Sequence, residues 1–318
     1  MLLKYSCFNY LNNEYLLKNL NNQLILKKSE IWPKLAKIDI FSVELEGNRI
    51  EKLKNHTFKP FKHIVKLTLN DFKFSLVENL AFAGLGHLKI LVIDSQPPYF
   101  LPFDFDYFGS EEKLNGNLIL KPIELLKNLN ELYLHNFIIT QTFFNTFHSL
   151  AVLDLSYCDI NKLDNLFFAQ ISNLRVLNLK CCKIFEIQCN SFCNLSKLEI
   201  LNLRFNKINH LNETVFNGLS NLKSLNLSHN NLNDIKIGSF RYLINLEELD
   251  LSNSCIEKLD DGFFHGISNL KRLNLSYNTY LKEADSHIFN ELKYINKLNV
   301  DNCLIEEKLK DLFYFNKM

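Results

Sequence analysis

The sequence has little glycine, proline, methionine and tryptophan, with 9, 6, 2 and 1 residues respectively among 318. It contains no run of 18 or more apolar residues, so it predicts no membrane-spanning helix. Neither sign of charge dominates: the formal net charge of +1 gives no overall field that favours nucleic acid as a partner. The apolar fraction of 47% and the charged fraction of 22% are those of a folded globular chain.

Motifs that carry chemistry are also missing. There is no phosphate-binding P-loop, no HExxH motif and no GxSxG motif, and GLGHLK lacks the third glycine of a dinucleotide-binding fingerprint. The nine histidines show no ligand spacing, and the carboxylate pair Asp104 and Asp106 implies no acid or base partner. We therefore expect no enzyme activity, no cofactor and no metal ion.

A repeat with a period of 24 residues dominates the chain. Six LxxLxL strings begin at Leu150, Leu174, Leu198, Leu222, Leu246 and Leu270. The complete pattern, LxxLxLxxNxLxxL followed by a late Phe and Leu, occurs in the units that begin at Leu198 and Leu222. The phase extends less strictly to Ile40, Ile64, Leu88, Leu129 and Ile295, which gives eleven coils.

The pattern has a direct physical interpretation. The LxL core alternates, so it predicts a short strand with two leucines pointing inward. The Asn slot follows at the turn, where the side-chain amide can satisfy backbone groups that the bend leaves unpaired, coil after coil. No coil buries its apolar residues alone, so the coils stack. We therefore predict an α/β solenoid, curved, with a parallel concave sheet of about eleven strands and an irregular convex side.

The 24-residue unit with its late Phe resembles the typical leucine-rich repeat of animal extracellular proteins, including Toll-like, chaoptin-like and Slit-like proteins. The resemblance covers about residues 35–310 and implies a horseshoe. It also implies a non-catalytic adhesion or receptor-type module, extracellular or at the cell surface, that recognises protein ligands on its concave face. An intracellular scaffold or adaptor, or a non-catalytic subunit of an enzyme complex, is the alternative.

The ends of the chain depart from that family. Secreted members usually carry Cys-rich caps, whereas Cys7 stands alone near the start and Cys303 is the last cysteine. Polar residues interrupt the N-terminus too early for a signal peptide, so either the protein is cytoplasmic or the chain lacks its true start. We expect residues 1–34 to form an N-terminal capping segment and residues 35–318 to form the solenoid. The oligomeric state is left open.

The remaining cysteines sort by their place in the repeat. Cys158, Cys182 and Cys303 occupy the Asn slot, where a buried thiol is tolerated. A metal site formed by Cys181, Cys182, Cys189 and Cys193 is conceivable, but the spacing matches no usual zinc pattern. A Cys189–Cys193 disulfide would require that the return path is not a regular helix.

Residues 97–128 interrupt the period. Leu88 and Leu129 are 41 residues apart, and four of the six prolines lie between them. We expect either an irregular extra coil with a bulging loop or a single coil with a long insertion. Its aromatic residues are interpreted either as a binding lip or as a plug that packs on neighbouring coils: Phe100, Phe103, Phe105 and Tyr107.

The residues that flank the strand leucines are expected on the concave face, and an Asn/Asp stripe runs through their middle column. Aromatic and basic side chains on a rigid sheet are typical of binding hot spots. The residues that we predict to bind the partner are Tyr133, Tyr157, Lys180, Arg204, Phe205, His229 and Tyr277.

Five NxS/T sequons occur in the chain. Asn226 and Asn274 arise from the repeat string LNLS itself. Asn55, Asn194 and Asn212 follow the strands and are better candidates for glycosylation, which matters only if the chain is secreted.

Overall fold

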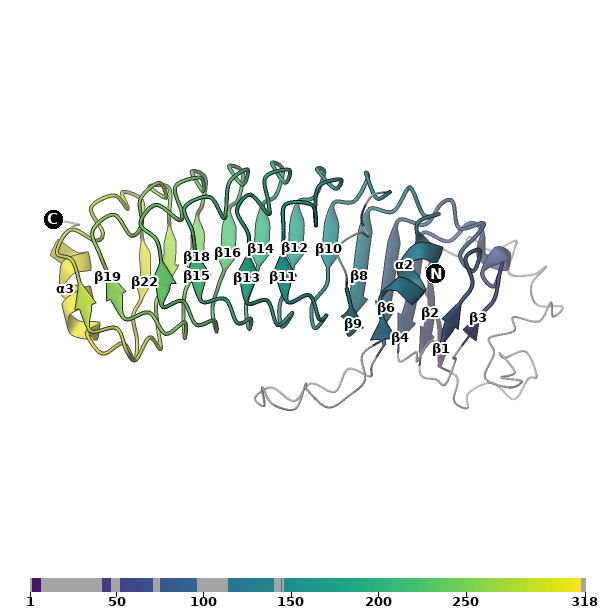
Figure 1. Cartoon of the computed structure of the whole chain (residues 1–318), viewed down its shortest axis with the longest axis horizontal. Coiled ribbons are helices and arrows are strands. Elements are labelled where there is room, and N and C mark those ends of the chain that lie inside the picture. Colours follow the sequence, from purple (N-terminus) through teal and green to yellow (C-terminus); the bar gives the residue numbers. More distant parts are fainter. Residues whose placement is uncertain are drawn as a thin grey trace. The chain divides into compact units, whose positions relative to one another are not determined.

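The structure is a computed structural model that describes residues 2–6, 42–46, 52–70, 75–95, 114–139, 144 and 146–315. The chain divides into two compact units, Met1–Leu150 and Ala151–Met318, which are described separately as unit 1 and unit 2. Parallel strands stacked coil upon coil form the framework of each unit (Figure 1).

The sheet of unit 2 confirms the predicted phase of the repeat. Its register places equivalent residues of successive coils opposite one another, so Leu177 faces Leu201 and Leu201 faces Leu225. Seven parallel strands follow in chain order: β10 (Val152–Asp154), β12 (Val176–Asn178), β14 (Ile200–Asn202), β16 (Ser224–Asn226), β18 (Glu248–Asp250), β20 (Arg272–Asn274) and β22 (Lys297–Asn299).

The sheet of unit 1 has the same parallel order. Its strands are β1 (Leu2–Ser6), β2 (Ser42–Glu46), β4 (Lys66–Asn70), β6 (Ile90–Asp94) and β8 (Glu131–His135). Each of the eleven predicted coils therefore contributes a strand to one of the two units, and β1 adds another from within residues 1–34. β1 pairs with β2 along the edge of the sheet, and the capping role of residues 1–34 remains a prediction.

The interruption after Leu88 is a single coil with a long insertion. β6 pairs directly with β8, with Ile90 opposite Glu131, so residues 114–130 add no strand to the main sheet. They form β7 (Leu114–Asn115), which pairs with β9 (Phe137–Ile138), and the short helix α2 (Asn117–Ile123). The aromatic residues Phe100, Phe103, Phe105 and Tyr107 lie outside the described residues.

The return path of most coils carries a strand of only two residues, on the side opposite the main sheet of its unit (Figure 1). These strands pair two by two. In unit 1 they are β7 with β9, and β3 (Lys52–Leu53) with β5 (Leu76–Val77), near the 3-10 helix η1 (Lys59–Phe61). In unit 2 they are β11 (Lys162–Leu163) with β13 (Glu186–Ile187), β15 (His210–Leu211) with β17 (Asp234–Ile235), and β19 (Lys258–Leu259) with β21 (Glu283–Ala284).

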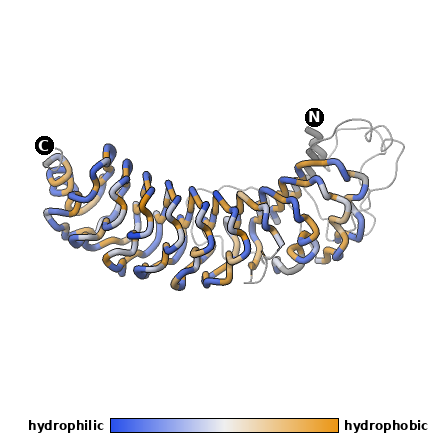
Figure 2. The backbone as a smooth tube through the Cα atoms, turned by 90° about the horizontal axis from the view of Figure 1, so that it is seen from above, coloured by the Kyte–Doolittle hydropathy of each residue, from blue (hydrophilic) through white to orange (hydrophobic). Residues whose placement is uncertain are grey.

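The core fills the space between the two sides of each coil. Apolar and polar stretches alternate around every coil (Figure 2), and the inward leucines are fully buried. The late phenylalanines stack between coils of unit 2: ring centroids are 6.0 Å apart for Phe168 and Phe192, 6.4 Å for Phe192 and Phe216, and 6.1 Å for Phe216 and Phe240. This spacing is favourable for offset aromatic pairs, so the repeated Phe aligns the coils as well as filling the core.

A ladder of buried asparagine amides holds the turn that follows each strand, as predicted. The side-chain oxygen of Asn206 accepts the N–H groups of Cys182 and Ile184, both at 3.0 Å. Its amide nitrogen donates to the carbonyls of Leu179 at 2.8 Å and Leu203 at 2.9 Å. One side chain thus satisfies four backbone groups in two coils, in an interior where each unsatisfied group would be costly.

Cysteine and serine replace asparagine in some of these slots. The thiol of Cys182 donates to the carbonyl of Leu155 at 3.0 Å, and the hydroxyl of Ser254 donates to that of Leu227 at 3.2 Å. These shorter side chains do not accept the backbone N–H groups that the amide oxygen of asparagine accepts. Instead, the N–H groups of Ile160 and Leu232 donate to the backbone carbonyls of Cys182 and Ser254. The turn therefore tolerates the replacement through a second set of backbone bonds.

A helix, α3 (Glu306–Phe315), packs on the coil of unit 2 that begins at Leu270. Leu309 is completely buried, and the ring of Phe313 meets that of Phe289 edge-on at 6.1 Å. The ammonium group of Lys308 donates to the carbonyl of Ala284 at 2.8 Å. Among the described residues, a helix rather than a disulfide-linked cap therefore covers the apolar side of this coil, and no helix has the length and apolar character needed to cross a membrane.

Replacing Asn206 by alanine should lower the free energy of unfolding of unit 2 by about 3 kcal/mol, because it leaves buried backbone donors and acceptors unpaired. Urea unfolding followed by circular dichroism measures the effect. Asn209→Ala, at an exposed position three residues later, is the matched control. Equal losses in the two variants would contradict the ladder's role.

Candidate functional site

The sheet face is the outward surface of the main sheet, formed by side chains that alternate with the buried leucines. Its middle column in unit 2 is the Asn/Asp stripe: Asp154, Asn178, Asn202, Asn226, Asp250, Asn274 and Asn299. Each side-chain oxygen accepts the N–H of the residue two positions later, as Asn202 does from Arg204 at 3.0 Å. The predicted bonding along the sheet occurs between Asn178 and Asp154 at 2.8 Å. The stripe therefore mainly caps strand ends.

The residue just before each ladder slot adopts a left-handed backbone conformation that sequence reasoning did not anticipate. The φ angle is +65° at Tyr157, +57° at Phe205 and +57° at His229. Such a conformation costs about 1 kcal/mol for a residue with a side chain. Hydrogen bonds to the next coil offset this cost: the N–H of Phe205 donates to Ser228 O, and that of His229 donates to Ser252 O, both at 3.0 Å. The turn thus holds the bulky residues in fixed backbone positions.

Tyr157, Lys180 and Phe205 come together on three neighbouring coils. The Lys180 ammonium donates to the Tyr157 hydroxyl at 3.0 Å. The same ammonium lies 5.2 Å from the centroid of the Tyr157 ring and 5.7 Å from that of Phe205. These distances are within the range of cation–π attraction. Lys180 is therefore held between two aromatic rings.

Arg204 and His229 extend this group along the sheet face. The Arg204 guanidinium carbon lies 4.4 Å from the Phe205 ring centroid, and Nη2 lies 3.3 Å from Nε2 of His229. The ring centroids of Phe205 and His229 are 4.1 Å apart, and Asn253 Nδ2 lies 2.9 Å from Nδ1 of His229. We call these residues the basic–aromatic cluster: Tyr157, Lys180, Arg204, Phe205, His229 and Asn253.

The surroundings of His229 lower its pKa, so its imidazole stays uncharged down to a lower pH than the imidazole of a free histidine does. Burial is the largest cause that lowers its pKa, and the Arg204 guanidinium lowers the pKa further; the carboxylate of Asp250 opposes both. An uncharged imidazole can accept a hydrogen bond from Arg204. The cluster is therefore a cation pair supported by neutral aromatic groups.

The structure does not bring all the predicted binding residues together. Five of the seven belong to the basic–aromatic cluster, and Asn253 is a member that the prediction missed. Tyr277 lies further along the sheet face of unit 2, where 57% of its surface is exposed. Tyr133 is in unit 1, on β8, and its hydroxyl donates to Glu131 at 3.0 Å.

The three glycosylation candidates differ in their surroundings. Asn55 and Asn194 are exposed, whereas Asn212 is half-buried, and its side-chain oxygen accepts the N–H of Thr214 at 2.9 Å and its hydroxyl at 3.0 Å. The oxygen of Asn55 accepts the N–H of Leu80 at 2.9 Å. Asn55 and Asn194 therefore present their side chains more openly than Asn212 does.

The cysteine positions agree with their assignment in the repeat. Cys158, Cys182 and Cys303 are buried in ladder slots, and burial raises the pKa of the Cys303 thiol. Cys189 is exposed and Cys193 half-buried, and both are free thiols. Within the described ranges, no group of three or more His, Cys, Asp or Glu side chains is placed to hold a metal ion.

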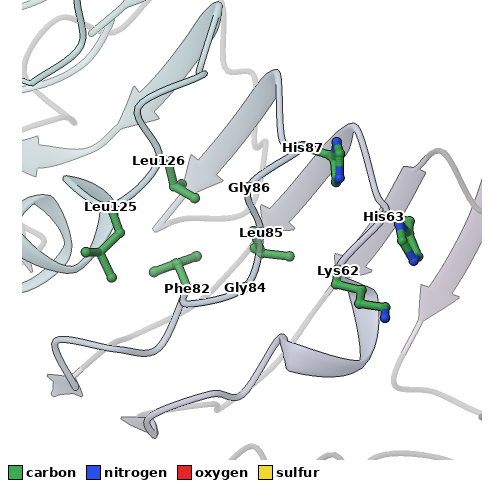
Figure 3. Close-up of a pocket in the computed structure, with 9 residues that line it drawn as sticks. All are labelled: Lys62, His63, Phe82, Gly84, Leu85, Gly86, His87, Leu125 and Leu126. Atoms are coloured by element: carbon green, nitrogen blue, oxygen red, sulfur yellow. The ribbon is translucent and has the colours of Figure 1, made fainter.

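A shallow hollow of about 370 Å³ lies in unit 1 between coil connections (Figure 3). His63 and His87 occupy equivalent positions of two coils, with ring centroids 5.9 Å apart, beside Lys62. Leu85, Leu125 and glycine backbone form much of the remaining lining. The lining has no carboxylate, thiol or hydroxyl side chain.

Comparison with known proteins identifies the repeat. The family model described as leucine rich repeat matches five overlapping stretches: residues 148–208, 172–232, 196–254, 220–278 and 244–305. No curated protein sequence matches the chain significantly.

Solved structures with the same fold include three receptor complexes. The TLR13–ssRNA13 complex has a TM-score of 0.63 and 24% identity over 82% of this chain and 40% of that one. The mouse RP105/MD-1 complex has a TM-score of 0.67 and 22% identity over 83% and 42%. The glycosylated Drosophila Toll–Spatzle complex has a TM-score of 0.67 and 19% identity over 86% and 36%. This chain thus spans about two fifths of the chains it resembles.

Replacing Arg204 by glutamine should raise the pKa of His229 towards the ordinary value of about 6.5, because a nearby positive charge is removed. NMR titration of the histidine ring signals measures this change. Lys223→Gln, which removes a cation that is paired with Glu199, is the control and should leave the pKa of His229 in place. An unchanged midpoint in Arg204→Gln would contradict the assigned coupling.

Proposed function

The chain belongs to the leucine-rich-repeat family, and on this basis we propose that it is a non-catalytic recognition protein that binds a protein partner on the sheet face of unit 2. The observation that carries the proposal is the basic–aromatic cluster. Its side chains already contact one another on a parallel sheet, so binding costs little conformational entropy. Tyr277 is proposed to extend the contact surface, and Tyr133 to serve as a separate contact in unit 1.

The related folds support a receptor or adhesion role at the cell surface or outside the cell. The RP105 and Toll structures are complexes with the proteins MD-1 and Spatzle, whereas that of TLR13 is a complex with ssRNA13. We favour a protein ligand for this chain because acidic and basic side chains alternate from coil to coil at the start of its main-sheet strands. Nucleic acid would require a continuous basic surface.

An intracellular scaffold is the second candidate, and the cysteines favour it. All seven cysteines in the described part of the chain are free thiols, and Cys189 is exposed. Free exposed thiols are more common in proteins of reducing compartments than in secreted ones. The thiols in ladder slots are buried and act as structural donors, so they are compatible with either location.

Phe205→Ala should weaken capture of the natural partner by roughly thirtyfold, the effect of losing a central aromatic hot spot. Arg204→Glu should weaken it at least as much. The measurement is affinity capture from the organism's own cells, followed by titration of the recovered protein. Phe185→Ala removes a half-exposed ring from the return path and is the matched control. Equal capture by folded Phe205→Ala and Phe185→Ala would place binding elsewhere.

If the protein enters the secretory pathway, Asn55 and Asn194 should carry glycans. Expression of the natural gene in animal cells and treatment with an endoglycosidase should then shift the mass, and Asn55→Gln with Asn194→Gln should remove most of the shift. A secreted, folded protein without a shift would contradict the assignment of these sites. Retention in the cytosol would support the scaffold instead.

A further inference from the structure

Several cations at the start of the main-sheet strands of unit 2 are paired with carboxylates of neighbouring coils. Glu199 binds both Arg175 at 3.3 Å and Lys223 at 2.7 Å. Lys271 pairs with Glu247 at 3.0 Å, and Arg272 pairs with Glu248. These pairs are each worth little in water, but they neutralise the flanks of the sheet face.

Lys180 and Arg204 differ from these cations. In the described part of the chain neither forms an ion pair: Lys180 bonds to the Tyr157 hydroxyl and Arg204 to the His229 imidazole. The two nearest acids of the middle column are already engaged, since Asp154 accepts the Ser156 N–H and Asp250 accepts the Ser252 N–H and hydroxyl. Two positive charges thus share a half-buried surface without a carboxylate bound to either.

Both cations lie against the same ring, that of Phe205. Their mutual repulsion in this position is only partly offset by cation–π attraction, which contributes about 0.5–1 kcal/mol at an exposed site. In addition, Nε of Arg204 is buried and donates to no acceptor. An anion that approaches both groups would relieve the repulsion and, after a small rotation of the guanidinium, accept from the arginine's two-nitrogen edge.

We infer that the basic–aromatic cluster binds an acidic side chain of the protein partner, with the carboxylate between the Lys180 ammonium and the Arg204 guanidinium and the adjoining apolar part of the partner against Phe205. This inference rests on the proposed recognition function and specifies the chemical group of the partner that the sheet face binds. The lowered pKa of His229 supports it, because an uncharged imidazole leaves the site with two positive charges rather than three.

The surroundings favour an isolated carboxylate over a nucleic-acid strand. A strand carries a regular series of phosphates, and binding it requires several cations in a row. Around the cluster, Asp154 and Asp250 lie in the middle column, Glu248 is the first residue of β18, and Glu199 and Glu247 directly precede β14 and β18. These acids would repel successive phosphates, whereas a single carboxylate meets only the two cations.

The inference is tested with the full chain and a capped pentapeptide that has one central Glu between a Leu and a Tyr, compared with the same peptide in which Gln replaces Glu. Backbone amide NMR signals of residues 180, 204 and 205 and the ring signals of His229 report binding. The Glu peptide should bind at these residues, at least roughly tenfold more tightly than the Gln peptide, and more weakly as salt rises, because screening reduces the attraction.

The combined substitution Lys180→Gln with Arg204→Gln should reduce binding of the Glu peptide at least roughly tenfold, corresponding to the loss of charge-assisted hydrogen bonds. The matched control, Lys223→Gln with Lys271→Gln, removes two cations that already have carboxylate partners and should bind as the natural protein does. Circular dichroism confirms that both variants fold.

Equal binding of the Glu and Gln peptides, equal losses in the two double variants, or no detectable binding of the Glu peptide would overturn the inference. So would tighter binding of a deoxythymidine decamer at the same amides. If partner capture depends on Phe205 but not on Lys180 and Arg204, the inference fails while the proposed function stands. If the Glu peptide binds the cluster but capture is insensitive to Phe205, the proposed function fails instead.

Discussion

The turn that leaves each main-sheet strand is the constraint on which the rest of the structure depends. At this bend the backbone groups of two successive coils must be satisfied in an interior that excludes water. The Asn206 amide meets this need with four bonds, two accepted from the preceding coil and two donated to carbonyls of both coils. Because the same residue joins neighbouring coils, it also fixes their spacing. The leucines and phenylalanines can then stack in register.

The same turn determines how the sheet face presents its side chains. The residue before the ladder slot is held at positive φ by a hydrogen bond to the next coil, even where that residue is Phe205 or His229. Each side chain of the Asn/Asp stripe caps the end of its strand by accepting the N–H of the residue two positions later. Hydrogen-bonding residues with structural roles therefore occupy the slot and the middle column, and the two outward-facing columns between them are left to vary. The basic–aromatic cluster lies in these variable columns, so its side chains can change without loss of the hydrogen bonds that hold the coil.

Recognition by such a surface differs from catalysis in a pocket. The cluster offers two cations, two phenyl-type rings and an imidazole with a lowered pKa, spread over several coils rather than enclosed in a cavity. Its ion-paired flanks limit the positive field to a small area. A rigid and locally charged surface of this kind suits a partner with one acidic anchor and an apolar neighbour.

The sequence by itself determined the coil. The 24-residue period placed eleven strands, the residues that face outward, and the slots of Asn206, Cys182 and Cys303, because one strand turn recurs at a fixed spacing. The period could not give the left-handed backbone at Phe205, the β1 edge strand, the helix α3 at the end of unit 2, or the choice between an extra coil and a long insertion. Nor could it show that Lys180 meets Phe205 and that Arg204 meets His229. Those contacts join residues of different columns and coils, about 25 positions apart, and only the twist and spacing of the stacked sheet decide them.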